Sequence, residues 1–217
     1  MTFIKICGIK TEEQALGAAA AGADFIGMVF ATSPRQVTPA TAKRINAAVK
    51  LKYPKLKTVG VFVNMPAPIV QKLADTCGLD WAQMHGDEPW EYCLELARPV
   101  IQVVRVARNY SPEFISKNFE YGRKLLAGRQ VFFMLDTSVK DKFGGTGRAF
   151  DWSQAREIAE KFPVIVAGGL NPQNVAAAIE MLQPWGVDVS SGVETEGVKD
   201  MKKIEIFIRA VREADGR

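Results

Sequence analysis

The sequence predicts an α/β fold, a single (β/α)8 TIM barrel around a parallel eight-stranded sheet. Short apolar runs alternate with longer amphipathic stretches along the whole chain, which is typical of repeated β-α units. The apolar runs show little polar alternation, as expected of strands covered on both faces. The chain has 217 residues, so eight units fit in one compact barrel, and we expect residues 1–217 to form one domain.

The predicted strands are rich in β-branched and aromatic residues. We expect them over Phe3–Cys7, Phe25–Val29, Thr58–Val63, Trp81–Met84, Ile101–Arg105, Val131–Asp136, Val164–Ala167 and Val187–Ser190. An open doubly wound sheet is the structural alternative. The first strand is not followed by a GxGxxG turn, which weighs against a dinucleotide-binding sheet of that kind.

Capping residues and prolines mark several helix starts between these strands. The expected signals are Thr11 with Gln14 before a helix ending at Gly22, Pro39 opening the second helix, and Asn171 as N-cap with Pro172 at the first helical position. The crossover from Ser111 to Gly128 is the least periodic and is also assigned as a helix.

Composition narrows the classes of partner. Apolar residues make up 47% and charged residues 24% of the chain, as in ordinary globular proteins. The net charge of +4 is spread out, without the basic and aromatic runs of a nucleic-acid surface. The apolar run at the N-terminus is too short for a signal peptide, and no stretch approaches the ~20 apolar residues of a membrane span. We therefore expect a cytoplasmic protein with a small anionic ligand, no nucleic-acid partner and no membrane contact.

The cysteines and the histidine limit the chemistry further. Cys7, Cys77 and Cys93 are an odd number at wide spacings, which suggests neither a disulfide framework nor a zinc site and fits a reducing compartment. His85 is the one histidine, so a multi-histidine metal site is impossible. We expect no metal.

Three glycine-rich segments follow the sixth, seventh and eighth predicted strands. They are Gly144-Gly145-Thr146-Gly147, Gly168-Gly169-Leu170 and Ser190-Ser191-Gly192-Val193-Glu194. Any one of them alone could simply form a tight turn. Together, at the end of the barrel where phosphate sites commonly lie, they predict an anion grip of backbone amides and hydroxyl groups. The expected phosphate-binding residues are Gly168, Gly169, Ser190, Ser191 and Gly192.

Two strand ends carry an acid and base pair. Cys7 ends the first strand and should point into the barrel mouth, where Lys5, two residues earlier on the same face, could favour a reactive thiolate. A small buried hydrophobe is the commoner fate of a cysteine. Asp136 ends the sixth strand after an apolar run, and a partly desolvated carboxyl group there could act as a general acid. A helix cap or an ion-pair partner is the alternative.

Two further candidates lie in loops on the same side. Arg35 follows the second strand, and its planar fork suits bidentate contact with a carboxylate, although most exposed loop arginines are only solvated. His85 ends the fourth strand, where it could hydrogen-bond a substrate or shape the turn.

The chain resembles phosphoribosylanthranilate isomerase, an enzyme family of tryptophan biosynthesis, over nearly its whole length. Besides the three glycine-rich segments, the motifs that carry the resemblance are Lys5-Ile6-Cys7-Gly8, Ser33-Pro34-Arg35, Gly60-Val61-Phe62-Val63-Asn64, Gln83-Met84-His85-Gly86, Leu135-Asp136-Thr137 and Val187-Asp188-Val189. The departures, Met84 and Met134 in place of leucine, are apolar exchanges.

The resemblance implies a cofactor-free Amadori rearrangement of N-(5'-phosphoribosyl)anthranilate to 1-(2-carboxyphenylamino)-1-deoxyribulose 5-phosphate. In this family role Asp136 is the general acid at the ribose ring oxygen and Cys7 the general base at carbon 2. Arg35 would hold the anthranilate carboxylate. The loops after the seventh and eighth strands would hold the phosphate.

Two other functions stay open. The related histidine-pathway isomerase carries out the same rearrangement on a substrate with two phosphates, but its base on the first strand is an aspartate where this chain has Cys7. A catalytically silent barrel that binds phosphorylated metabolites would need neither Cys7 nor Asp136. The sequence does not distinguish a monomer from a homodimer.

Overall fold

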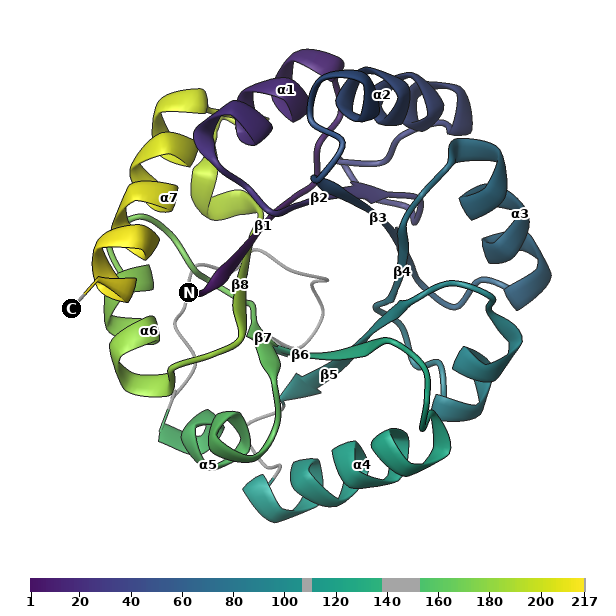
Figure 1. The fold of residues 1–217 in the computed structure, drawn as a ribbon, viewed down its shortest axis with the longest axis vertical. Helices are drawn as coiled ribbons and strands as arrows, with labels where there is room; N and C mark the ends of the chain where they lie inside the picture. The colour runs from purple at the N-terminus through teal and green to yellow at the C-terminus, as the bar shows by residue number, and fades with distance from the viewer. Residues whose placement is uncertain (107–110, 138–152, 217) are drawn as a thin grey trace.

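A computed structural model describes residues 1–106, 111–137 and 153–216, and its strands close a parallel barrel in the order β1 to β8 (Figure 1). Strand β1 pairs with both β2 and β8, which completes the ring. The strands are β1 Phe3–Cys7, β2 Phe25–Val29, β3 Lys57–Phe62, β4 Trp81–Met84, β5 Val100–Val106, β6 Val131–Thr137, β7 Val164–Val166 and β8 Gly186–Val189. Each overlaps its predicted range, and the predicted fold class is confirmed.

Helices form an outer ring around this barrel (Figure 1). They are α1 Glu12–Ala21, α2 Pro39–Lys52, α3 Ala67–Cys77, α4 Pro112–Leu125, α5 Ser153–Lys161, α6 Val175–Leu182 and α7 Met201–Asp215. Helix α4 lies in the least periodic crossover, where a helix is therefore confirmed. In the described residues, no helix is long and apolar enough to cross a membrane.

Two of the predicted helix starts are confirmed. The hydroxyl of Thr11 accepts a hydrogen bond from the N–H of Gln14, and Gly22 ends α1 with a left-handed φ of 103°. Pro39 begins α2 behind the N-cap Thr38.

Helix α6 begins at Val175, three residues after the predicted first helical position, Pro172. The carbonyl of Asn171 accepts hydrogen bonds from the N–H groups of Asn174 at 3.2 Å and Val175 at 3.1 Å, while its side chain accepts from the N–H of Gln173 at 2.9 Å. These are the hydrogen bonds of an N-cap residue, and a turn over residues 172–174 leads from Asn171 into the helix. The helix begins at Val175, after this turn.

The fourth crossover lacks the α-helix that a regular β-α unit would have. It contains the 3-10 helix η1, Trp90–Glu95, which starts after Pro89. Pro99 closes the segment and disfavours a helical conformation at the residue before it. Trp90 still covers the sheet, with its ring centroid 5.6 Å from that of Phe133.

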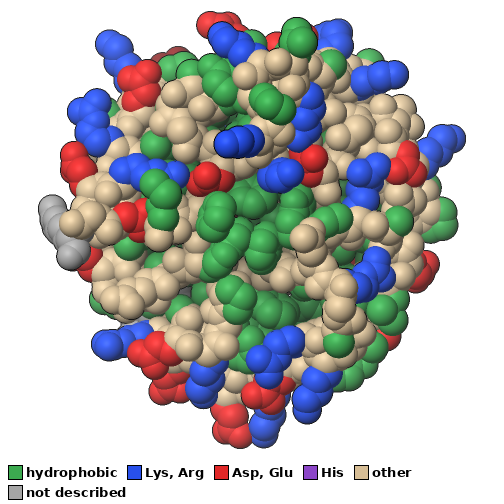
Figure 2. Space-filling view, viewed as in Figure 1, with side chains coloured by type: hydrophobic (Ala, Val, Ile, Leu, Met, Phe, Trp, Pro, Cys, Tyr) green, Lys and Arg blue, Asp and Glu red, His purple; other side chains and the backbone are tan. Residues whose placement is uncertain are grey.

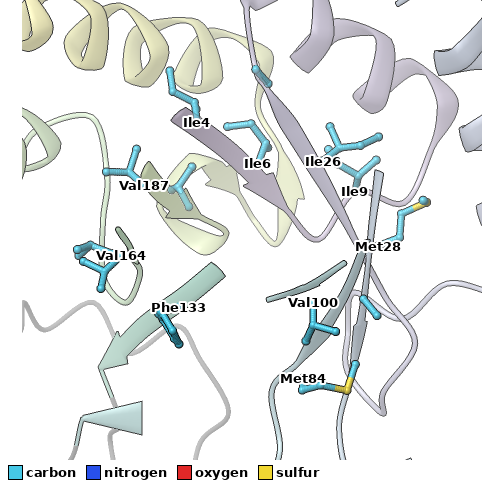
Figure 3. Close-up of a cluster of buried hydrophobic side chains, with 14 of the residues drawn as sticks. Ile4, Ile6, Ile9, Ile26, Met28, Met84, Val100, Phe133, Val164 and Val187 are labelled. Carbon is cyan, nitrogen blue, oxygen red and sulfur yellow. The ribbon is translucent and has the colours of Figure 1, made fainter. Parts of the chain in front are cut away.

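Buried side chains form two clusters on opposite faces of the strands. The larger cluster fills the layer between sheet and helices, and Ile4 and Ile6 lie between β1 and the helices above it in Figure 3. The smaller cluster fills the barrel interior with Phe25, Val59, Trp81, Ile101, Val103, Met134, Ile165 and Ala167. The period of two along β1 therefore turns Lys5 and Cys7 toward the interior.

Aromatic rings fill the end of the barrel where the strands begin. Phe3 stacks on Trp185 with ring centroids 4.3 Å apart, and Trp81 stacks on Phe132 at 4.6 Å. Figure 2 shows this face, with apolar side chains at its centre and charged ones around them. Because these rings fill one end of the barrel, a polar site is expected at the opposite end, where the strands finish.

Candidate active site

A cavity of about 510 Å³ opens at the end of the barrel where the strands finish. All nine predicted site residues line it: Cys7, Arg35, His85, Asp136, Gly168, Gly169, Ser190, Ser191 and Gly192. The structure thus brings together residues separated by as much as 185 positions in the sequence, from 7 to 192. The segment Gly144-Gly145-Thr146-Gly147 lies outside the described residues.

Cys7 ends β1 and is buried beside two cations. A β-carbon on Gly27 would lie 2.8 Å from Sγ of Cys7 and 3.0 Å from Nζ of Lys5, so only glycine leaves room for both. Burial raises the pKa of the Cys7 thiol above its ordinary value, and Lys5 and Lys199 offset this only in part. In the free protein Cys7 is therefore a thiol that needs favourable surroundings to become a base.

Lys5 is itself held by an interior carboxylate. Its Nζ lies 2.8 Å from Oδ1 of Asp188 on β8, and both side chains are buried. Burial opposes the charge on Lys5, but Asp188 and Cys7 outweigh that effect and raise the pKa of the ammonium group. Lys5 therefore stays cationic next to the sulfur.

Asp136 is buried near the carboxyl end of β6 and meets His85, the residue that follows β4. Nε2 of His85 lies 3.1 Å from Oδ2 of Asp136. The other ring nitrogen, Nδ1, lies 3.0 Å from Nε2 of Gln83. The carboxyl group thus belongs to a line of three side chains that all border the cavity.

Arg35 reaches the cavity from the loop after β2 and is gripped by Glu194. Nε and Nη2 of Arg35 donate to the two carboxylate oxygens at 2.7 and 2.6 Å. Glu194 also accepts from Nζ of Lys199 at 2.6 Å. The hydrogen bond to Glu194 raises the pKa of Arg35. Burial alone would raise the pKa of Glu194, but its two cationic partners lower it.

Glu194 and Lys199 come from a short antiparallel hairpin of β9 (Glu194–Thr195) and β10 (Val198–Lys199). Burial lowers the pKa of Lys199, although Glu194 opposes the shift. Lys199 also donates to the carbonyl of Ser190 at 2.9 Å, which ties the hairpin to the loop after β8. Gly8, at φ 83°, makes room for this convergence, because a β-carbon there would lie 2.6 Å from Cδ of Arg35.

The glycine loops after β7 and β8 lie against each other. Gly168 and Gly169 adopt left-handed φ values of 91° and 69°, which place the backbone along the cavity wall. A β-carbon on Gly192 would lie 1.9 Å from the carbonyl oxygen of Leu170. Glycine at these positions therefore lets two backbone segments approach one anion together.

Asp188 and Gln83, like Lys5, were detectable as polar residues inside predicted apolar strands. A polar residue in such a strand is expected to face the barrel interior, but the sequence does not indicate which residue it contacts there. Glu194 and Lys199 had no comparable signal as a pair, because the hairpin that joins them to Arg35 has no periodic pattern. Altogether the cavity places a thiol, a carboxyl group and two glycine-rich loops around one small volume, an arrangement suited to moving protons on a bound molecule.

Comparisons with known proteins identify one family over nearly the whole chain. A profile of the family N-(5'phosphoribosyl)anthranilate (PRA) isomerase matches residues 4–210. The N-(5'-phosphoribosyl)anthranilate isomerase of Dehalococcoides mccartyi is 46% identical over 216 residues, covering 100% of this chain and 98% of its own. That of Moorella thermoacetica is 45% identical over 217 residues, covering 99% and 92%.

Solved structures give the same result. The phosphoribosyl anthranilate isomerase of Thermotoga maritima has a TM-score of 0.84 at 34% identity, over 98% of this chain and 100% of its own. A phosphoribosyl anthranilate isomerase in complex with reduced 1-(o-carboxyphenylamino)-1-deoxyribulose 5-phosphate has a TM-score of 0.80 at 34% identity, with the same coverage.

Proposed function

Because the chain belongs to the N-(5'-phosphoribosyl)anthranilate isomerase family, we propose that it converts N-(5'-phosphoribosyl)anthranilate to 1-(2-carboxyphenylamino)-1-deoxyribulose 5-phosphate. This Amadori rearrangement is an aldose-ketose isomerisation in the synthesis of L-tryptophan. The observation that carries the proposal is the placement of Cys7 and Asp136 in one cavity with the glycine loops after β7 and β8. The rearrangement needs one acid and one base, and these two groups supply them.

Asp136 acts first, as the general acid. It donates a proton to the ribose ring oxygen while the bond from that oxygen to carbon 1 breaks. The lone pair of the anthranilate nitrogen forms a double bond to carbon 1 and gives an open-chain Schiff base. The buried position of Asp136 beside His85 supports this role.

Cys7 acts second, as the general base. Its thiolate takes the proton from carbon 2, the freed electron pair forms the double bond between carbons 1 and 2, and the nitrogen regains its lone pair. The resulting enolamine tautomerises to the ketone. No electrons leave the substrate, so the proposed reaction needs no redox cofactor.

The two ends of the substrate are anchored apart from the reacting carbons. We assign the phosphate to Gly168, Gly169, Ser190, Ser191 and Gly192. Arg35 receives the anthranilate carboxylate through Nη1, the guanidinium nitrogen that Glu194 leaves over. Holding both ends fixes the ribose between acid and base, which lowers the entropic part of the barrier.

We also infer that the protein works in a reducing compartment, the cytoplasm. Its three cysteines are free and buried. The proposed base is a thiol that oxidation would inactivate.

A coupled assay tests the function. N-(5'-phosphoribosyl)anthranilate is generated in situ, and the loss of its fluorescence is followed after the protein is added. The expected result is a rapid loss that depends on protein concentration. Unchanged fluorescence with folded protein would refute the proposal.

A further inference from the structure

Gln83, on the barrel wall, is linked to Asp136 through a single side chain. Its Nε2 lies 3.0 Å from Nδ1 of His85, whose Nε2 lies 3.1 Å from Oδ2 of Asp136. Gln83 is 1% exposed and Asp136 is 7% exposed. The buried amide of Gln83 therefore contacts the acid of the proposed reaction indirectly, through His85.

The direction of these hydrogen bonds follows from the atoms involved. The amide nitrogen of Gln83 carries two hydrogens and only donates, so Nδ1 of His85 must accept. A neutral imidazole that accepts at Nδ1 carries its hydrogen on Nε2. His85 therefore donates from Nε2 to Oδ2 of Asp136.

The backbone of His85 is fixed independently of this amide. Its N–H donates to the carbonyl of Phe62 at 2.9 Å, and the N–H of Gly86 donates to the buried carboxylate of Glu88 at 2.8 Å. These bonds place the strand end but leave the imidazole free to change its tautomer. Within the described residues, the hydrogen-bond partner of Nδ1 is the amide nitrogen of Gln83.

The amide oxygen of Gln83 helps to explain why a glutamine is present at this position. Within the described residues, Oε1 of Gln83 is buried and has no hydrogen-bond partner. A buried polar atom without a partner lowers stability, and an apolar side chain of similar size would remove that penalty. The fold therefore gains little from the amide, whose remaining contact is the one with His85.

We propose that Gln83 is a positioning residue for Asp136: it holds His85 as the Nε2–H tautomer, which donates to Oδ2 and leaves the transferable proton on Oδ1. After that proton passes to the substrate, the same Nε2–H stabilises the carboxylate that remains. The proposal rests on the proposed role of Asp136 as the acid. The assignment of the tautomer stands on the geometry alone.

Nitrogen NMR tests the tautomer directly, because His85 is the one histidine in the chain. An untagged, 15N-labelled protein gives one set of imidazole signals. We expect hydrogen on Nε2 and a bare Nδ1. In Gln83→Glu the carboxylate can only accept, so the hydrogen should move to Nδ1. Hydrogen on Nδ1 in the wild-type protein, or a bare Nδ1 in Gln83→Glu, would overturn the proposal.

Kinetics and stability separate positioning from a structural role. For Gln83→Met we expect kcat to fall about ten- to hundredfold with KM nearly unchanged, since part of the general-acid contribution is lost. The variant should be at least as resistant to urea as the wild type. Normal turnover, or a loss of activity that only follows a loss of folded protein, would contradict the proposal.

A matched control is Gln102→Met. Gln102 is a buried glutamine on β5 that bonds to Cys93 and to the carbonyl of Glu88, away from the cavity. It should lose stability and keep the wild-type tautomer. Failure of the function itself looks different: a wild-type protein with hydrogen on Nε2 but no isomerase activity would refute the isomerase and keep the tautomer assignment.

Discussion

Lys5 and Asp188 form an ion pair inside the barrel, with Nζ 2.8 Å from Oδ1 and side-chain exposures of 1% and 9%. Removing one partner of such a pair leaves an uncompensated buried charge, which typically costs about 3–5 kcal/mol of stability. We therefore expect Lys5→Met to lower the free energy of unfolding by about that amount in urea titrations. The double variant Lys5→Met/Asp188→Leu should recover most of it. A double variant no more stable than the single one would contradict this account.

The pH dependence of Cys7 follows from its raised pKa. In the free enzyme the thiol predominates at neutral pH, and the thiolate fraction grows as the pH approaches the raised pKa. We therefore expect kcat/KM to increase from neutral to alkaline pH. The difference in thiolate absorbance between the wild type and Cys7→Ala should have its midpoint above the ordinary thiol value of 9.0. A midpoint below that value would show that the cations outweigh burial.

Loss of either proton-transfer group should abolish most turnover. For Cys7→Ser and Asp136→Asn we expect kcat to fall by about two orders of magnitude or more, because general acid or base catalysis contributes ~10²- to 10⁴-fold. Circular dichroism should show an intact fold. Cys77→Ser is the control, since Cys77 ends α3 and its thiol contacts the carbonyl of Pro39. Near-normal activity in either site variant would refute the role of that residue.

Arg35→Ala should weaken substrate binding more than turnover. A hydrogen bond to a charged group contributes about 1.5–3 kcal/mol, so we expect KM to rise about ten- to hundredfold. Arg44→Ala is the matched control, because Arg44 is an exposed arginine on α2 paired with Glu12. Steady-state kinetics at constant ionic strength measure both. An unchanged KM in Arg35→Ala would remove Arg35 from the carboxylate site.

Gly192→Ala should separate the glycine loops that follow β7 and β8. Its β-carbon would collide with the carbonyl oxygen of Leu170 at 1.9 Å, so the backbone must shift. We expect weaker inhibition by inorganic phosphate and a higher KM. Gly216→Ala is the control, because its β-carbon meets nothing closer than 3.7 Å. Equal phosphate affinity in the wild type and Gly192→Ala would exclude this loop from the grip.

The barrel and the chemical groups of its mouth could be predicted because both depend on local patterns. Strand ends place Cys7 and Asp136 at one edge through the geometry of the fold alone. The start of α6 could be predicted only to within three residues, because Asn171 makes the hydrogen bonds of a cap but a turn over residues 172–174 precedes the helix.

The ion pairs within the site could not be predicted from the sequence either. Arg35 and Glu194 are 159 positions apart, and nothing local to either residue specifies the other. The same holds for Lys5 and Asp188, which meet only because β8 closes against β1. Pairs of this kind are a product of barrel closure.

The stacked rings of Phe3, Trp185, Trp81 and Phe132 occupy the end of the barrel opposite the reacting groups. The two ends can therefore change independently during evolution. Substitutions that raise the melting temperature can accumulate among the rings, while new substrates are accommodated by altering the loops at the far end. A descendant of this barrel can acquire a different reaction without rebuilding the part that keeps it folded.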